Sequence, residues 1–287
     1  MAKILEPYGE LDCLFYYSKV ASVLAKFIHG KEIATKTTLK DFSFLKRGSN
    51  SSPLFIEDLK EVDDKMLKLR RSHLNQARDN LTAKQILIWQ YFVPRKPVNF
   101  FYACNGEKPG GPIDRIFIDI DRQSNSSEDA RKVCLSLVNI IKKDNDFAKL
   151  LKFKIFIMWT GSSFHVYLML NKKVNLKFYL RYLSYGKGKD ESFIMKWADD
   201  VKIRIGLNVK AGHQREKKAI ILDSSGTPSG KLARAPFSLH MKGMEIDGIA
   251  VPVSEKQLGN GDLIDKLRKL TADDIVKNLN SYSKLIP

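Results

Sequence analysis

Two carboxylates stand two residues apart in the otherwise apolar stretch RIFIDIDRQ, residues 115–123. In a strand, Asp119 and Asp121 would project from the same face, because successive side chains alternate between the two faces. Two acids in these positions repel each other unless a cation lies between them. Mg²⁺ and Mn²⁺ take oxygen ligands and keep coordination positions for water and phosphate. The pair therefore predicts a divalent-metal site, and the alternative is that these aspartates cap a turn at the strand end.

Three other strand-like stretches carry polar residues of the same kind. FHVYLML contains His165, AIILD ends at Asp223, and PFSLH ends at His240. If these strands are neighbours of the acidic strand, three carboxylates and two histidines converge on one surface. Three aspartates that hold two metal ions are a recurring arrangement for in-line phosphoryl transfer. The alternative for each histidine is a structural role, which is the more common one for a lone histidine on a strand.

The chain is strongly basic, and this favours a polyanionic partner. Its 287 residues include 49 Lys and Arg against 32 Asp and Glu, a net charge of +17 at pH 7. Nucleic acid is the first partner to consider at such a charge, and a solvated lysine-rich surface is the alternative. The hydrophobic content of 44% is that of a folded globular chain rather than a disordered one.

The elements that must position these residues follow from hydrophobic spacing and turn signals. Ser126 and Asp129 form a capping box that starts a helix directly after the acidic strand. Other expected features are a helix over 9–28, a loop at 47–53, a helix-prone region over 56–92, a turn at 105–112, strands at 153–159 and 164–170, a lysine-rich connector at 184–190 that contains Lys187 and Lys189, and two short helices after 255. Strands and helices do not alternate regularly, so we expect an α+β fold with a mixed sheet.

The cysteines argue against a disulfide-rich or zinc-binding scaffold, and the first apolar stretch argues against a membrane protein. Cys13, Cys104 and Cys134 show no CxxC spacing, which argues against a disulfide scaffold and against a structural zinc site. Charged residues, including Asp12 and Lys19, interrupt the stretch from 11 to 28, so it predicts neither a membrane span nor a signal peptide. We therefore expect a soluble intracellular protein.

The order of these motifs resembles the archaeo-eukaryotic primase superfamily, and in particular the DNA primase small (catalytic) subunit. FIDID, SFH and ILD are similar to the family's hydrophobic-Asp-hydrophobic-Asp, Ser-x-His and hydrophobic-Asp motifs. RAPFSLHMKG, at 234–243, is similar to its Arg/Lys-x-Pro-aromatic-Ser-Leu/Val-His-x-Lys signature and is the most specific match. The resemblance covers about residues 12–255. It implies a primase-polymerase catalytic domain over 1–255, with an RRM-like mixed sheet and flanking helices, and a short helical extension over 256–287.

The resemblance also implies a role for each motif residue. Two divalent ions, Mg²⁺ or Mn²⁺, would be held by the catalytic residues Asp119, Asp121 and Asp223. The incoming nucleoside triphosphate would be bound by Ser163, His165, Arg234, His240 and Lys242. An arginine fork and imidazole donors suit phosphate oxygens well.

The activity implied by the resemblance is that of a DNA primase, a DNA-directed RNA or DNA polymerase that makes primers from nucleoside triphosphates on a single-stranded DNA template. Such an enzyme acts in DNA replication within a primosome, and a primase large subunit is the protein partner that the family implies. Small subunits usually carry a Cys/His zinc knob after the acidic strand. This chain has no such cluster, so no zinc is expected.

Two alternatives stay open at the level of sequence. The first is a repair-type polymerase of the same superfamily, which extends primers instead of initiating them. The second is a non-catalytic protein that binds single-stranded nucleic acid through lysines and through aromatic residues such as Phe100, Phe101 and Tyr102.

Overall fold

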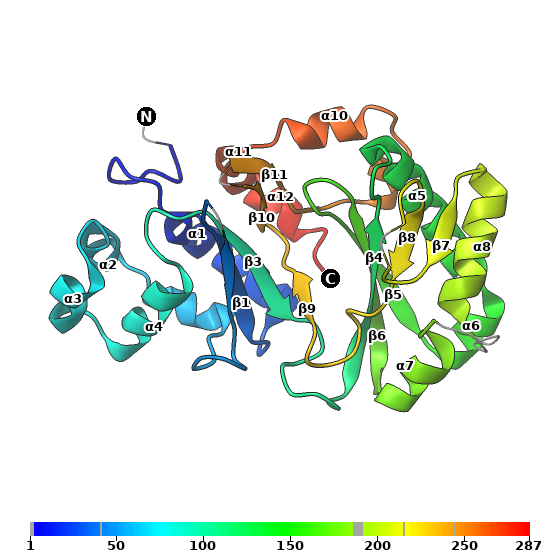
Figure 1. The fold of residues 1–287 in the computed structure, drawn as a ribbon, viewed down its shortest axis with the longest axis horizontal. Helices are drawn as coiled ribbons and strands as arrows, with labels where there is room; N and C mark the ends of the chain where they lie inside the picture. The colour runs from blue at the N-terminus through cyan, green and yellow to red at the C-terminus, as the bar shows by residue number, and fades with distance from the viewer. Residues whose placement is uncertain (1–2, 41, 186–191, 215, 244) are drawn as a thin grey trace. The chain divides into compact units, whose positions relative to one another are not determined.

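The computed structural model describes residues 3–40, 42–185, 192–214, 216–243 and 245–287 (Figure 1). The chain forms two compact units, each assembled from separate segments. Unit 1 comprises Met1–Ala103, Arg234–Val251 and Lys269–Pro287, and unit 2 comprises Cys104–Ala233 and Pro252–Arg268. The predicted α+β class with a mixed sheet is confirmed. Lys187 and Lys189 of the predicted connector lie outside the described residues.

Unit 2 is built on a six-stranded mixed sheet with the order β12-β5-β6-β4-β8-β7. The pairs β5–β6, β6–β4 and β4–β8 are antiparallel, and β7 runs parallel to β8. The strands are β4 (Ile113–Asp121), β5 (Phe153–Trp159), β6 (Phe164–Val174), β7 (Val209–Ala211), β8 (Ile220–Asp223) and β12 (Val251–Pro252). The acidic strand β4 therefore lies between the strand that carries His165 and the strand that ends at Asp223 (Figure 1).

The alternating pattern of β4 divides an apolar face from an acidic one. Ile116, Ile118 and Ile120 are fully buried, and the adjacent helix α5 packs on β4 and β6. The predicted capping box starts this helix, since the Ser126 hydroxyl accepts a hydrogen bond from the Asp129 backbone N–H. The helices of unit 2 are α5 (Ser127–Lys143), α6 (Asn145–Leu150), α7 (Leu176–Tyr182), α8 (Phe193–Ile205), α9 (Glu255–Leu258) and α10 (Leu263–Arg268).

The segment after Asp223 is fastened to β4 and fixes how the two strands align. The Thr227 hydroxyl accepts from the Phe117 N–H at 2.9 Å and donates to the Phe117 carbonyl at 3.0 Å. Only glycine fits at position 226, because a Cβ there would lie 2.5 Å from the Phe117 ring. These contacts hold β8 in register with the acidic strand.

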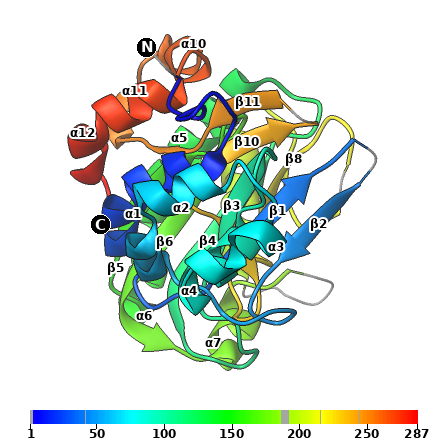
Figure 2. The same ribbon diagram turned by 90° about the vertical axis from the view of Figure 1, so that its left-hand side faces the viewer.

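Unit 1 contains a four-stranded sheet with the order β2-β1-β3-β9, in which β1 is antiparallel to both of its neighbours (Figure 2). Its strands are β1 (Ile33–Thr38), β2 (Ser43–Lys46), β3 (Val98–Ala103) and β9 (Leu232–Arg234), where the chain passes from unit 2 to unit 1. Helix α1 (Cys13–Ile28) confirms the helix predicted over 9–28. The helix-prone region over 56–92 forms η1 (Ile56–Glu61), α2 (Asp64–Leu69), α3 (Leu74–Ala77), η2 (Arg78–Asn80) and α4 (Ala83–Tyr91).

The expectation that the PFSLH strand joins the acidic strands is wrong. Strand β10 (Leu239–Lys242) pairs instead with β11 (Glu245–Ile249) in a separate two-stranded sheet. The cause is a sharp bend at Phe237, whose φ is +62° and whose N–H donates to the Ala250 carbonyl at 2.7 Å. Helix α1 holds this bend, because the Tyr16 hydroxyl donates to the Phe237 carbonyl at 2.9 Å.

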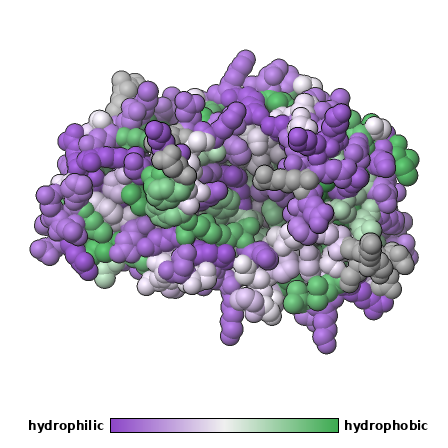
Figure 3. Space-filling view, in the orientation of Figure 1, coloured by the Kyte–Doolittle hydropathy of each residue, from purple (hydrophilic) through white to green (hydrophobic). Residues whose placement is uncertain are grey.

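The C-terminal part of the chain forms more helices than predicted. In place of two short helices after residue 255, the described residues form α9, α10, α11 (Ala272–Lys277) and α12 (Leu279–Ser283). The division into a catalytic domain (1–255) and an extension (256–287) stays a prediction. In the described ranges, no helix has both the length and the apolar character needed to cross a bilayer. Hydrophilic residues dominate the face in Figure 3, as the charge of +17 leads one to expect.

Candidate active site

Asp119 stands in the middle of a row that crosses three adjacent strands. It is in register with His165 of β6 on one side and with Asp223 of β8 on the other. Directly opposed residues of antiparallel strands share a face, with Cβ atoms about 4.5–5.5 Å apart. Asp121 follows two positions later on the same face, opposite Ile221. Residues that are far apart in sequence therefore form one acidic face, defined by Asp119, Asp121 and Asp223.

His165 borders the acidic face and is almost fully enclosed. Its Nε2 lies 3.4 Å from Oδ1 of Asp119, and the side chains are 8% and 41% exposed respectively. The ring of Phe117 packs edge-on against the imidazole, with centroids 4.7 Å apart, and the Tyr167 hydroxyl lies 3.5 Å from Nδ1. These contacts fix the orientation of the imidazole, so that one nitrogen is directed at the carboxylate of Asp119.

Asp223 has a tyrosine partner that sequence reasoning missed. The Tyr185 hydroxyl donates to Oδ1 of Asp223 at 2.9 Å, and the Ser225 N–H donates to the same oxygen at 2.7 Å. Burial and the negative charge of Asp223 raise the pKa of Tyr185 well above its usual value, so the hydroxyl remains a donor. Tyr185 lies in the connector that the sequence marks only as a loop, and no periodic signal there distinguishes it.

Asp121 also caps a turn, as the alternative for this motif anticipated. Its carboxylate accepts from the Gln123 N–H at 3.1 Å and from the Gln123 side-chain amide at 2.6 Å. Gln123 has a φ of +50°, so these two bonds stabilise a left-handed turn at the end of β4. The turn and the acidic face are compatible, because the carboxylate belongs to both.

The acidic face has the donor chemistry of a site for a hard divalent cation. Among the described residues, neither Asp119 nor Asp223 forms an ion pair with a lysine or arginine, although the chain is strongly basic. The described residues contain no group of three or more His, Cys, Asp or Glu side chains that are already close enough together to hold a metal ion. Oδ1 of Asp223 is directed at Tyr185 and Ser225, and facing carboxylates repel each other without a cation. Carboxylate oxygens suit Mg²⁺ or Mn²⁺, and that assignment stays a prediction.

Ser163 has a clear structural contact. Its hydroxyl donates to the carbonyl of Ile120, and its N–H donates to the Thr160 hydroxyl at 3.0 Å. The serine therefore ties the turn between β5 and β6 to the acidic strand. Its predicted contact with a triphosphate stays a prediction.

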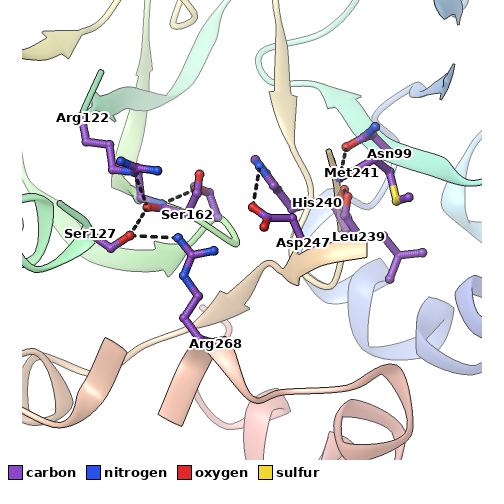
Figure 4. Close-up of polar contacts among 12 residues, drawn as sticks. Asn99, Arg122, Ser127, Ser162, Leu239, His240, Met241, Asp247 and Arg268 are labelled. Carbon is purple, nitrogen blue, oxygen red and sulfur yellow. Dashed lines mark hydrogen bonds and ion pairs between the residues drawn. The ribbon is translucent and has the colours of Figure 1, made fainter. Parts of the chain in front are cut away.

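Three polar side chains that sequence reasoning missed hold the same turn (Figure 4). Arg122 donates to the Ser162 carbonyl at 3.1 Å, and the Ser127 hydroxyl donates to it at 2.9 Å. Arg268 in turn donates to the Ser127 hydroxyl at 3.1 Å. Arg122 directly follows the acidic motif and could have been suspected, whereas nothing in the sequence connects Arg268 with this turn. The network fixes the segment that leads into His165.

Arg234 belongs to unit 1 and is held from several sides. Its Nη1 donates to the Asn99 side chain at 3.0 Å, to the Ser238 hydroxyl at 3.2 Å and to the Leu239 carbonyl at 3.0 Å. The guanidinium also lies over the Phe101 ring, 5.1 Å from its centroid. These contacts give the arginine a defined position in the RAPFSLHMKG segment.

His240 and Lys242 follow on β10 in the same unit. Nε2 of His240 lies 3.8 Å from Oδ2 of Asp247, and Lys242 is exposed. Figure 4 shows the two side chains of His240 and Asp247 facing each other. We call Arg234, His240 and Lys242 the basic group. It belongs to unit 1, whereas the acidic face, Ser163 and His165 belong to unit 2.

No family model and no curated protein matches the sequence. Among solved structures, the chain is similar to the polymerase domain from Mycobacterium tuberculosis ligase D, a structure determined in complex with DNA. The TM-score is 0.61 at 16% sequence identity, and the match covers 99% of this chain and 96% of that one. Likeness at this level of identity concerns the fold. This chain therefore has the fold of a polymerase domain over nearly its whole length.

Proposed function

We propose that this protein is a template-directed nucleotidyltransferase of the primase-polymerase type, which synthesises RNA or DNA primers from nucleoside triphosphates. The observation that carries the proposal is the row in which Asp119 faces both Asp223 and His165 across adjacent strands. The polymerase-domain fold supports it, and so do the motifs that resemble the primase small subunit. In the reaction, a 3′-hydroxyl oxygen bonds to the α-phosphorus of the triphosphate, the bond to the β-phosphate oxygen breaks, and pyrophosphate leaves.

The residues of the acidic face would hold the divalent ions. Two bound ions, Mg²⁺ or Mn²⁺, would supply activation of the attacking hydroxyl and stabilisation of the charge on the transferred phosphorus. Asp119, Asp121 and Asp223 provide the negative charge and fix its position. His165 would orient Asp119 and donate to the triphosphate. Triphosphate binding by Arg234, His240 and Lys242 is carried by their resemblance to the primase motif alone. Catalysis then depends on positioning and electrostatics, without a dedicated side-chain base.

The primer-making function brings further expected partners: a single-stranded DNA template, nucleoside triphosphates and a primase large subunit. A specific observation favours the second candidate, a repair-type polymerase that only extends primers. That observation is the fold likeness to a polymerase domain taken from a DNA ligase.

A template assay tests the proposed function. With single-stranded DNA, nucleoside triphosphates and Mg²⁺ or Mn²⁺, but no primer, we expect dinucleotides and longer products, and we expect none when EDTA is added. An annealed primer in a parallel reaction separates the candidates. Extension of that primer without products from the bare template would support the repair-type polymerase, and DNA binding without any synthesis would indicate a non-catalytic binding protein.

Replacing His165 by alanine is expected to raise the KM for nucleotide by about tenfold, a loss of roughly 1.4 kcal/mol, with a smaller effect on kcat. The reason is the orientation of Nε2 toward Asp119 on the face where the triphosphate would bind. His165→Gln keeps a donor in a similar place and is expected to restore part of the affinity. Steady-state kinetics check this, and an unchanged nucleotide dependence in His165→Ala would assign the histidine a purely structural role.

A further inference from the structure

A pocket of about 510 Å³ opens in unit 2 next to the acidic face. Ile221 lines it, and this residue is the register partner of Asp121. Tyr185 lines it as well, and its hydroxyl donates to Asp223. The volume is in the usual range for sites that bind small organic molecules. Two residues of the described lining are therefore direct neighbours of Asp121 and Asp223.

One wall of this pocket is aromatic and apolar. The Tyr185 and His213 ring centroids lie 5.6 Å apart in a tilted arrangement, with an interplanar angle of 30°. Met195 of α8 and Ile221 of β8 add apolar surface to the lining. The His213 side chain is exposed, so its ring is accessible to a ligand. Such a wall suits a flat, uncharged ring.

The charges of the described lining favour a base over a phosphate. The lysine of the described lining, Lys210, has its ammonium group 2.8 Å from both carboxylate oxygens of Glu216, so its charge is neutralised. A phosphate site needs cations or N–H donors that are not already paired. Gln214 lines the same pocket with a side-chain amide, which both donates and accepts hydrogen bonds and so matches the polar edge of a base.

We propose that Tyr185 and His213 form a platform on which a nucleobase stacks, in the pocket beside the acidic face. This inference rests on the proposed function and deepens it, since it names the part of the substrate that the pocket takes. Tyr185 links the two sites, because its ring lines the pocket while its hydroxyl holds Asp223. The base would come from a nucleic-acid single strand or from the nucleoside triphosphate, because both present the same ring.

Fluorescence of 2-aminopurine tests the platform, because stacking on an aromatic ring quenches it. The two probes are a short single-stranded oligonucleotide that contains one 2-aminopurine and the 2-aminopurine nucleoside triphosphate, each titrated in EDTA. We expect the unmodified protein and Tyr185→Phe to quench at least one probe. Tyr185→Ala and His213→Ala are expected to bind that probe about tenfold more weakly and to lose most of the quenching. The quenched probe identifies the source of the base.

The controls separate stacking from other effects. Tyr182→Ala removes a tyrosine of α7 that does not line the described part of the pocket, so it should bind like the unmodified protein. An oligonucleotide of the same length in which every residue is abasic should bind equally to all variants. His213 is exposed, so His213→Ala keeps the test valid if Tyr185→Ala fails to fold. Equal binding and quenching of both probes by His213→Ala and the unmodified protein would overturn the platform. Because metal is absent, that result is independent of whether the protein synthesises primers.

Discussion

Replacing Asp119 by asparagine is expected to reduce nucleotide incorporation by about 10³-fold or more, the effect of removing a preorganised charge from a phosphoryl-transfer site. Substitution of Asp119 is expected to have a large effect on activity, because its carboxylate lies between His165 and Asp223 and is accessible. Asparagine has nearly the same shape but no charge and one carboxylate oxygen fewer, so the change removes the charge and a ligand oxygen while the side-chain volume is kept. Primer synthesis or extension measures the effect.

The same substitution should leave the fold intact. Asp119 and Asp223 are like charges in directly opposed positions, so removal of one relieves repulsion and keeps the thermal midpoint equal or raises it. Asp146→Asn is the matched control, because Asp146 is exposed on α6 and its ion-pair partner among the described residues is the surface Lys149. We expect full activity from it. Incorporation by Asp119→Asn at the rate of the unmodified protein would remove the metal assignment, since a structural acidic face has no need of that charge in catalysis.

Replacing Asp12 by alanine is expected to destabilise the protein by about 3–5 kcal/mol, the usual effect of breaking a buried ion pair. Asp12 and Arg70 are both buried. The Arg70 guanidinium donates two hydrogen bonds to the Asp12 carboxylate, from Nε to Oδ2 at 2.5 Å and from Nη2 to Oδ1 at 2.8 Å. Asp12 is also the N-cap of α1, where it accepts from the Leu14 N–H at 3.0 Å. The loss therefore combines an unpaired buried cation with a missing helix cap. Urea denaturation measures it.

A surface pair of the same type in unit 1 provides the comparison. Glu10 and Arg95 form an ion pair with side chains 36% and 50% exposed, so Glu10→Ala should change the free energy of unfolding by less than about 1 kcal/mol. The buried pair also affects the basic group. Helix α1, which Asp12 caps, contacts the segment that carries the basic group through hydrogen bonds of Tyr16 to Phe237 and of Tyr17 to Leu239. Equal stability losses in the two variants would show that burial of Asp12 adds nothing.

Much of the acidic face could be predicted from the sequence, because it depends on a local rule. Alternation along a strand places Asp119 and Asp121 on the face opposite Ile118 and Ile120, and the structure has both isoleucines fully buried. The capping box at Ser126 and the turn before β4 are also local signals, and they fixed where the acidic strand begins and ends. That the strands of His165 and Asp223, β6 and β8, both lie beside β4 was a hypothesis, and it is confirmed.

The rest depends on contacts between distant residues, which no local pattern encodes. The alternation in PFSLH is that of a strand, but the bend at Phe237 and the pairing with β11 take it into another sheet. Tyr185 and Arg268 reach the site from a loop and from a short C-terminal helix, where their neighbours in sequence carry no signal. From the sequence alone, Gly226 is a residue of a turn. Its close approach to the Phe117 ring, which leaves no space for a Cβ, results from the pairing of β8 with β4.

The central claim is that carboxylates of β4 and β8 bind divalent ions together. Titration of Mn²⁺, followed by the loss of the free-ion electron paramagnetic resonance signal, tests it without any substrate. We expect the unmodified protein and Asp146→Asn to bind Mn²⁺, and Asp119→Asn and Asp223→Asn each to lose at least tenfold in affinity, because each removes a charged ligand. Equal Mn²⁺ binding by all four proteins would contradict the account.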